Sequence, residues 1–322
     1  MDAKRTWAVV LAGGDGTRLG NVTRIHNGAP VPKQFCSLSG GPTLLQRTLK
    51  RAERLVPTER LVPVVNDHHR QWWSEDLDHI PPRNIIVQPR NRGTAVGLLL
   101  PLLEILDRDG LATILVLPSD HFVSDEVVLE TAMRQALAGL DAEPDAIVAL
   151  GITPDSLDAD YGWLVPGPQR ADGVHEVSFF VEKPPLEQAR QLRDLGAVWS
   201  SFIFAARADR LLALYEQLDP RLVWSVRAAR WSPNGAPTSS MAATFDHLAT
   251  ADFSRDILQR VPTRLLVCRV PPCGWCDLGT PDRVARLCNA TSPTATSGNG
   301  NTERRPVLST LVHDHLAHAG GH

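Results

Sequence analysis

A buried strand that runs straight into a glycine cluster constrains this chain more than any other sequence feature. Residues 6–12 (TWAVVLA) form a continuous apolar run, as expected for a central strand buried on both faces of a parallel sheet. Three glycines follow at once: Gly13, Gly14 and Gly16. Such a loop lets the backbone approach a ligand and turn its amides toward phosphate oxygens, with Arg18 as an adjacent cation. A tight turn beside a surface arginine is the structural alternative.

Neither of the two best-known phosphate-binding motifs fits this loop. A dinucleotide fingerprint, G-x-G-x-x-G, matches at Gly14 and Gly16, but Leu19 takes the third glycine position. A P-loop would need a lysine before a serine or threonine, and none stands there. The pattern therefore disfavours a dehydrogenase and indicates another kind of nucleotide loop.

Strand-like and helix-like segments alternate through the first half of the chain. Apolar runs predict strands at residues 60–65, 84–89, 112–118 and 146–152. Helical spacing of apolar residues predicts helices at residues 42–56, 94–110 and 127–140. This order predicts an α/β fold whose mostly parallel sheet is covered on both faces.

Composition excludes several classes of protein. The net charge is −3 and there is no long basic run, so we expect neither a nucleic-acid partner nor an anionic membrane surface. No apolar run approaches the ~20 residues of a membrane span. Five cysteines are too few, and odd in number, for a disulfide scaffold. We therefore expect a cytoplasmic protein.

An ordered set of short motifs carries a family resemblance. The motifs are LAGGDGTRL (11–19), PKQF (32–35), QPRNRGTA (88–95), PSDH (118–121), YGW (161–163), FVEKP (180–184), WSSFIF (199–204) and GWCDLGT (274–280). Together they resemble the sugar-1-phosphate nucleotidyltransferases, most closely the mannose-1-phosphate guanylyltransferases. The resemblance implies a Rossmann-like, three-layer α/β/α fold with a mostly parallel mixed sheet and an inserted sugar-binding region. We expect the short form, without the isomerase domain of longer relatives.

The resemblance implies transfer of a nucleotidyl group from a nucleoside triphosphate, favoured to be GTP, to a sugar 1-phosphate, favoured to be mannose 1-phosphate. Such chemistry depends on holding two mutually repelling anions in line and neutralising growing charge. The implied catalytic residues are Arg18, Lys33 and Asp120. The implied nucleotide-binding residues are Ala12, Gly13, Gly14, Gly16, Thr17, Gln88, Asn91, Gly93 and Thr94.

The resemblance also implies a metal and a sugar site. Asp120 and Asp277 would hold Mg²⁺, which accepts one or two carboxylates together with phosphate oxygens and water. Without the resemblance, Asp120 would be interpreted as a helix cap or turn residue and Asp277 as a residue of a surface turn. The implied sugar-binding residues are Gly162, Glu182, Lys183 and Ser200, and Trp163 and Trp199 are candidates for the pocket wall.

Two departures put the sugar in doubt. Ser200 stands where relatives commonly have asparagine, and Phe202 where many have glycine. The alternatives are therefore another hexose 1-phosphate or another base, or a non-catalytic sugar-nucleotide sensor on the same scaffold. A homodimer is compatible with each.

Domain boundaries and one distracting pattern complete the interpretation. We expect a catalytic domain at residues 1–288, with a nucleotide-binding part to about residue 150 and a sugar-binding part at 151–288. The Thr/Ser/Gly-rich stretch predicts a disordered tail at residues 289–322. CGWC (273–276) has redox spacing but lacks the strand-to-helix context, so we interpret its cysteines as incidental.

Overall fold

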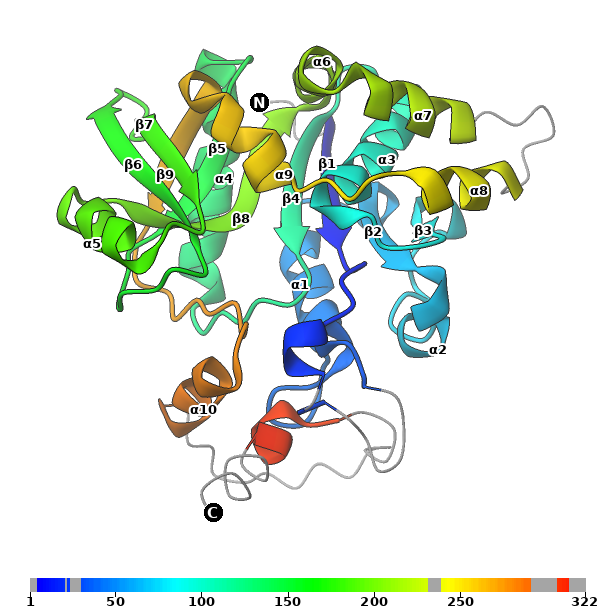
Figure 1. The fold of residues 1–322 in the computed structure, drawn as a ribbon, viewed down its shortest axis with the longest axis horizontal. Helices are drawn as coiled ribbons and strands as arrows, with labels where there is room; N and C mark the ends of the chain where they lie inside the picture. Colours follow the sequence, from blue (N-terminus) through cyan, green and yellow to red (C-terminus); the bar gives the residue numbers. More distant parts are fainter. Residues whose placement is uncertain (1–4, 21, 24–29, 231–238, 291–305, 313–322) are drawn as a thin grey trace.

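The computed structural model describes residues 5–20, 22–23, 30–230, 239–290 and 306–312. Within these, one nine-stranded sheet has the order β3-β2-β1-β4-β8-β5-β9-β7-β6 (Figure 1). The strands are β1 (Thr6–Leu11), β2 (Leu61–Asn66), β3 (Ile86–Gln88), β4 (Thr113–Pro118), β5 (Ile147–Ile152), β6 (Gly162–Gln169), β7 (His175–Glu182), β8 (Val198–Arg207) and β9 (Leu265–Val270). The α-helices are α1 (Leu44–Glu53), α2 (Arg70–Trp73), α3 (Gly93–Arg108), α4 (Glu126–Ala142), α5 (Leu186–Asp194), α6 (Ala208–Leu218), α7 (Pro220–Arg230), α8 (Ser239–His247), α9 (Phe253–Asp256) and α10 (Pro281–Ala290).

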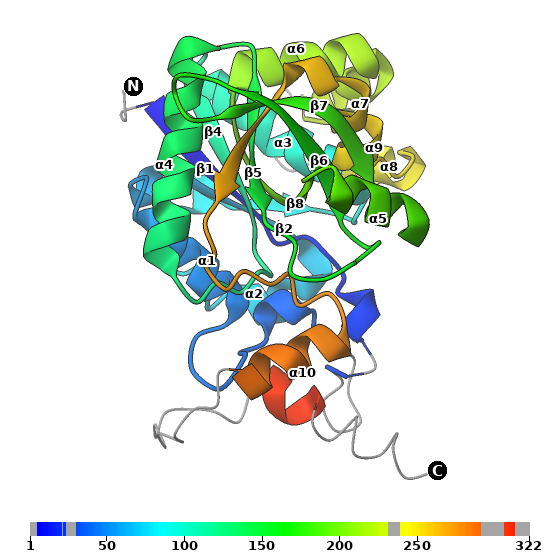
Figure 2. The same cartoon turned by 90° about the vertical axis from the view of Figure 1, so that its left-hand side faces the viewer.

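Helices cover both faces of the sheet, as the three-layer expectation requires. In β1, Ala8 and Val10 face one apolar core, which α1 and α4 complete. Trp7 and Val9 face the other core, which α3, α6, α7 and α9 complete (Figure 2). Alternate residues of one strand thus enter opposite cores, which explains the uninterrupted apolar run in the sequence. Among the described helices, none combines the length and apolar character that a membrane span needs.

The expected mixed sheet is confirmed, although antiparallel pairs are more numerous than the first half of the sequence indicates. Parallel pairing joins β1 to β2 and β4, β2 to β3, and β5 to β9. β8 runs antiparallel to β4, β5 and β6, and β7 antiparallel to β6 and β9. The sheet is therefore mixed. An apolar run predicts burial equally well for either direction, so the sequence of β8 carried no directional signal.

Local polar contacts determine where the helices that frame the sheet's carboxyl edge begin. Thr43 and Gln46 form a reciprocal capping box at the start of α1. Asp125 accepts hydrogen bonds from two amides at the start of α4. α3 begins at Gly93 with φ of 86°, where a Cβ would lie 2.3 Å from the carbonyl oxygen of Ala251. That position requires glycine for both reasons.

The expected division near residue 150 does not match the spatial layers. β8 lies in the later part of the sequence but occupies the middle of the sheet, between β4 and β5. α6, α7 and α9 also come after residue 150, yet they pack on α3. The reason is that α3 needs an apolar cover on its outer side, and the chain supplies it from residues 208–256. The segments before and after residue 150 therefore form one interleaved body.

The tail is ordered where the structure describes it, against the expectation of a disordered segment. Val307 pairs in parallel with Ser37, and the amides of Leu308 and Ser309 donate to the carbonyls of Ser37 and Leu38. Leu308 is fully buried. Figures 1 and 2 both show this red segment beside the blue chain that follows β1, at the opposite end of the molecule from the N-terminus. The apolar residues after the polar stretch provide the docking energy; the rest of the expected tail beyond residue 290 lies outside the described residues.

Hydrogen exchange tests this docking. The amides of Leu308 and Ser309 should be protected because both donate to backbone carbonyls beneath a buried side chain. Leu308→Ala should remove about 2–5 kcal/mol of packing and expose them, whereas Thr310→Ala, on the exposed side, should not. Rapid exchange of both amides in the unaltered protein would contradict the docked segment.

Candidate functional site

Two adjoining cavities open at the carboxyl ends of the parallel strands. The first, here called the aspartate cavity, has a volume of about 240 Å³ and is lined by Gly16, Thr17, Arg18, Leu19, Lys33, Asp120, His121, Asp277, Leu278 and Gly279. The second, the α3 cavity, has a volume of about 360 Å³. Its polar lining includes Gly13, Gly14, Gln34, Gln88, Asn91, Gly93, Thr94, Asp120 and Asp252. Asp120 and His121 line both, so the two cavities are continuous.

Backbone pairing brings Asp120 and Asp277 to one place. The chain after β4 and the chain after β9 form an antiparallel bridge between Phe122 and Cys276, with hydrogen bonds of 2.8 and 2.9 Å. Asp120 precedes one partner and Asp277 follows the other. The two aspartates, far apart in the sequence, therefore line the same cavity.

The Lys33 ammonium ties these segments together. Its Nζ lies 3.0 Å from Oδ2 of Asp120 and donates to the carbonyl oxygens of Asp277 and Leu278. Lys33 is only 8% exposed, so this charge is compensated inside the protein. Arg18, by contrast, is exposed at the cavity rim and has no hydrogen bond or ion pair to any residue that the structure describes. It is a fixed charge available to an anion.

Three groups orient the Asp277 carboxylate. Tyr161 donates to Oδ1 at 2.9 Å, the amide of Gly279 donates to Oδ1 at 3.0 Å, and Arg283 lies 3.0 Å from both oxygens. Burial alone would raise the pKa of Asp277, but the charges of Lys33 and Arg283 outweigh it and lower the pKa. Asp277 is therefore ionised at neutral pH.

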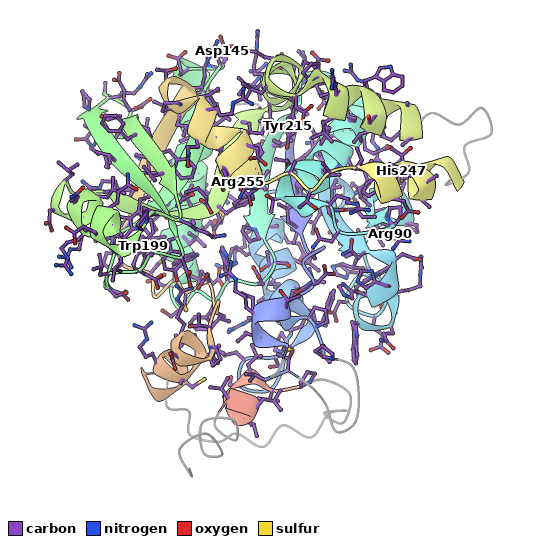
Figure 3. All side chains as sticks on the ribbon, viewed as in Figure 1. Arg90, Asp145, Trp199, Tyr215, His247 and Arg255 are labelled. Carbon is purple, nitrogen blue, oxygen red and sulfur yellow. The ribbon has the colours of Figure 1, made fainter. Side chains whose placement is uncertain are left out.

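Arg283 is the centre of this network, and the sequence patterns did not single it out. It is 5% exposed and also pairs with Asp158. The guanidinium stacks over Tyr161 at 4.3 Å from the ring centroid. The sequence feature that could have identified Arg283 is its position in the first turn of the helix that follows GWCDLGT. Tyr161 also contacts Trp199, which Figure 3 labels, at a centroid distance of 4.5 Å.

His121 is a neutral wall of the cavity. Burial lowers its pKa to about 4, although Asp120 and Asp277 act in the opposite direction. Its Nδ1 accepts a hydrogen bond of 3.2 Å from the indole of Trp275. The imidazole therefore adds no positive charge at neutral pH and is held in one orientation.

The side chains of Gln34 and Asn66 hold the glycine loop by its backbone carbonyls. Gln34 donates to the carbonyls of Ala12 at 3.0 Å and Gly14 at 2.7 Å, and Asn66 donates to the carbonyl of Gly13 at 2.6 Å. The backbone N–H groups of residues 13–16 have no acceptor among the residues that the structure describes. Because the carbonyls are occupied, the loop presents donors to an anion. Sequence reasoning missed Gln34 and Asn66.

The α3 cavity contains the residues predicted to face the base. Gln88, at the end of β3, is buried with its amide near the Cα atoms of Gly13 and Gly97. Asn91 accepts a hydrogen bond from the amide of Gly93 at 2.9 Å. The Thr94 hydroxyl accepts one from the amide of Phe253 at 2.8 Å, which fastens the 251–253 segment over the start of α3. Both hydrogen bonds order the cavity wall.

The predicted sugar residues lie on β6 to β8, outside the lining of the two cavities. Glu182 is largely buried, with Lys183 Nζ 3.6 Å away. Burial raises the pKa of Glu182 to about 7; Lys183 opposes this shift and Asp252 adds to it. A Cβ at Gly162 would lie 2.5 Å from Oε2 of Glu182, so a larger residue there would displace this carboxylate. The Asp252 carboxylate acts electrostatically on Glu182 and also lines the α3 cavity. It therefore connects the predicted sugar residues with that cavity.

β8 carries a local distortion at the residues that depart from the family pattern. Phe202 has φ of 59°, a left-handed conformation that disfavours residues other than glycine. Its ring lines the α3 cavity, and the register with β5 shifts at this point. Ser200 Oγ lies 3.4 Å from the Phe202 amide and in neither cavity lining.

Two other candidates have structural roles. Trp163 is fully buried and donates to the carbonyl of Asp158, so it is a core residue and not a pocket wall. Cys273 and Cys276 are free thiols whose pKa values burial raises. Their backbone carbonyls accept hydrogen bonds from backbone amides of the 122–125 segment. These residues contribute through the backbone to holding Asp277.

Comparisons agree with this geometry. The nucleotidyl transferase family model matches residues 7–292. A mannose-1-phosphate guanylyltransferase of Sinorhizobium fredii is 30% identical over 324 residues, covering 96% of this chain and 60% of that protein. One of Salmonella typhimurium is 34% identical, covering 66% and 44%. The chain thus spans about half the length of these two relatives.

A solved structure extends the likeness to three dimensions. The crystal structure named mannose-1-phosphate geranyltransferase from Thermus thermophilus superposes with a TM-score of 0.75 at 28% identity, covering 88% of this chain and 79% of that one. A UDP-glucose pyrophosphorylase at 15% identity and a TM-score of 0.55 shares the fold. With the family match spanning nearly the whole described body, the chain belongs to the nucleotidyl transferase family.

Proposed function

We propose that this protein joins GTP and mannose 1-phosphate to give GDP-mannose and pyrophosphate. The observation that carries the proposal is the aspartate cavity, where Arg18, Lys33, Asp120 and Asp277 converge beside unpaired loop amides. The relatives named above as mannose-1-phosphate guanylyltransferases support the choice of base and sugar.

The reaction needs charge neutralisation more than acid–base chemistry. A sugar-phosphate oxygen forms a bond to the α-phosphorus, and the bond from that phosphorus to the bridging oxygen of pyrophosphate breaks. The loop amides and Arg18 bind the β- and γ-phosphates, and Lys33 holds charge on the α-phosphate side. Residues at the start of α3 and Gln88 face the base, because an amide offers both a donor and an acceptor.

The two aspartates fit a magnesium ion. Oδ1 of Asp277 already accepts three hydrogen bonds, whereas among the described residues Oδ2 accepts one only from Arg283 and retains lone pairs. The Asp120 side chain is 34% exposed, so a cation can reach it from solvent. Bound there, Mg²⁺ would supply charge stabilisation for the phosphates. Lys33 and Arg283 set the two carboxylates in place.

Glu182 and Lys183 are proposed to bind the sugar hydroxyls and the sugar phosphate. The positive φ of Lys183, 48°, turns the chain between the buried carboxylate and the exposed ammonium. Lys183 also donates its amide to the carbonyl of Tyr161. Because Tyr161 contacts Asp277, a single hydrogen-bonded path links the sugar residues to the aspartate cavity.

A substrate panel tests the proposal. Purified protein with Mg²⁺ should release pyrophosphate fastest from GTP and mannose 1-phosphate, with slower release for other bases and hexose 1-phosphates. Release that is fastest for another pair would keep the enzyme class and overturn the substrate. Absence of release with every pair, alongside measurable nucleotide-sugar binding, would support the sensor.

Asp277→Asn should lower kcat by about a hundredfold or more, because one metal-binding carboxylate is lost. Asp158→Asn is the matched control, since it removes another carboxylate that pairs with Arg283 and does not line the aspartate cavity. Steady-state turnover against Mg²⁺ concentration measures both. Equal losses in the two variants would mean that Asp277 acts only through Arg283.

Glu182 should give sugar use a pH dependence. As the carboxylate ionises around pH 7, its hydrogen bonds to hydroxyls strengthen. The ratio of kcat/KM for sugar 1-phosphate between the unaltered protein and Glu182→Gln should rise about tenfold from pH 6 to 8. A ratio independent of pH would remove Glu182 from sugar binding.

Folding stability should change in the opposite direction. The folded-state pKa of Glu182 lies above its ordinary value of 4.5, so its ionisation costs stability as pH rises from about 4.5 to 7. The free energy of unfolding, measured with urea, should therefore fall more over this pH range in the unaltered protein than in Glu182→Gln.

A further inference from the structure

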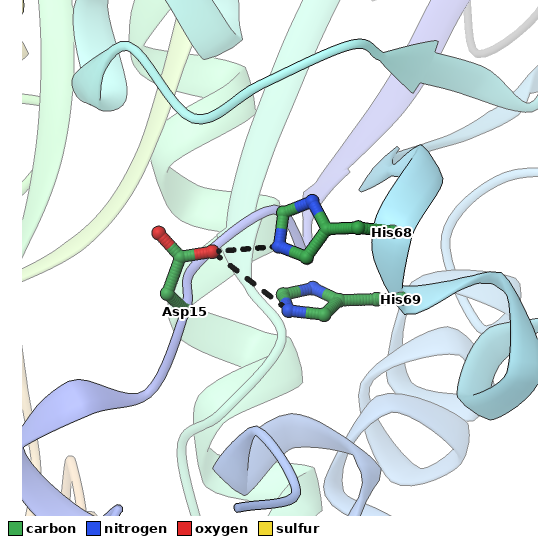
Figure 4. Close-up of side chains that lie close together, drawn as sticks. All are labelled: Asp15, His68 and His69. Carbon is green, nitrogen blue, oxygen red and sulfur yellow. Dashed lines mark hydrogen bonds and ion pairs between the residues drawn. The ribbon is translucent and has the colours of Figure 1, made fainter. Parts of the chain in front are cut away.

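A second cluster of metal-binding side chains lies next to the glycine loop. Asp15 stands between Gly14 and Gly16, and His68 and His69 follow β2 in the 3₁₀ turn Asp67–His69. β1 and β2 are parallel neighbours, so their following loops leave the same edge of the sheet. Figure 4 shows both imidazoles directed at the Asp15 carboxylate.

The spacing of the three side chains suits one ion. Oδ1 of Asp15 lies 3.2 Å from Nε2 of His68 and 3.8 Å from Nε2 of His69. One ligand atom from each residue lies within 4.8 Å of the others. Around a tetrahedral ion with bonds of about 2.0–2.2 Å, ligand atoms are roughly 3.3–3.5 Å apart. Small side-chain rotations would complete such a site.

His69 is held ready to coordinate. Its side chain is 9% exposed, and its ring packs against that of His68 at a centroid distance of 3.9 Å. At 3.8 Å its Nε2 is too far from Asp15 for a hydrogen bond. Its buried Nδ1 likewise has no hydrogen-bond partner among the described residues.

Asp15 is also oriented in advance. The amide of Asn91 donates to Oδ2 at 3.0 Å, which leaves Oδ1 facing the histidines. Asn91 is itself fixed by the amide of Gly93. Hydrogen bonds of this outer kind orient metal ligands and strengthen binding. On the other side, the ring of Phe35 packs edge-on against His69 at a centroid distance of 5.8 Å.

We propose that Asp15, His68 and His69 bind a first-row transition-metal ion such as Zn²⁺, at a site separate from Asp120 and Asp277. Two imidazoles and one carboxylate favour Zn²⁺, Co²⁺ or Ni²⁺ over Mg²⁺, which prefers oxygen ligands. Three protein ligands leave a fourth position open to water or another donor. The bound ion ties the glycine loop to the turn after β2 and so restrains the loop. Metal binding itself does not depend on the proposed reaction.

Zinc titration of the full chain tests the site. The sequence also contains His313, His315, His318 and His322, which could bind zinc, so all four are first replaced by alanine. This background protein, stripped with a chelator, is titrated with ZnCl₂ against a chromophoric competitor. It should bind one ion, and His68→Ala or Asp15→Asn should weaken binding at least tenfold. His79→Ala, a half-exposed histidine paired with Glu53, is the matched control and should change nothing.

Two further readouts separate the outcomes. Saturating Zn²⁺ should raise the melting temperature of the background protein by about 5 °C, but not that of His68→Ala. His68 is more than half exposed, so this variant should fold, and an unchanged melting temperature without zinc verifies that. Co²⁺ should give visible bands without a thiolate charge-transfer band.

Three results would overturn the proposal: no zinc binding in the background protein, unchanged binding in His68→Ala, or a thiolate band that assigns the ion to cysteines. The first would leave the cluster as a hydrogen bond between His68 and Asp15. None of the three depends on pyrophosphate release, so this proposal and the proposed function fail independently.

Discussion

One buried ammonium holds the candidate site together. Lys33 pairs with the Asp120 carboxylate and donates to the carbonyls of Asp277 and Leu278, so it connects the same two chain segments that the Phe122–Cys276 bridge joins. Two carboxylates that line one small cavity would otherwise repel each other. The cation offsets that repulsion, and the cavity keeps its shape before any substrate arrives.

Around this ion pair, further polar side chains hold Asp277 and the glycine loop in fixed orientations. Arg283 and Tyr161 hold Asp277, while Gln34 and Asn66 occupy the carbonyls of the glycine loop. Each of these contacts removes conformational freedom before binding, which reduces the entropy that substrates must lose together. The interleaving of β8 and α6–α9 with the first half of the chain extends this rigidity to the residues proposed to bind the sugar.

Much of this was predictable from sequence, for identifiable reasons. Apolar runs located the strands because burial on both faces leaves no polar positions, and the ordered motifs brought Asp120 and Asp277 to one site. The direction of β8 and the docking of residues 306–312 depend on distant partners that local patterns do not encode. Gln34, Asn66 and Arg283 were missed for the same reason, since an amide or guanidinium acquires its role from the group that the fold places opposite it. Trp163 shows the converse: a residue inside a motif whose position is set by core packing.

A crystal structure with GTP and Mn²⁺ in place of Mg²⁺ tests the central claim most directly, because the anomalous signal of manganese locates the cation without assumptions. The account predicts a manganese ion between the carboxylates of Asp120 and Asp277, with the triphosphate against the amides of residues 13–17 and the Arg18 guanidinium. A triphosphate bound elsewhere, or a manganese ion that contacts neither aspartate, would contradict it.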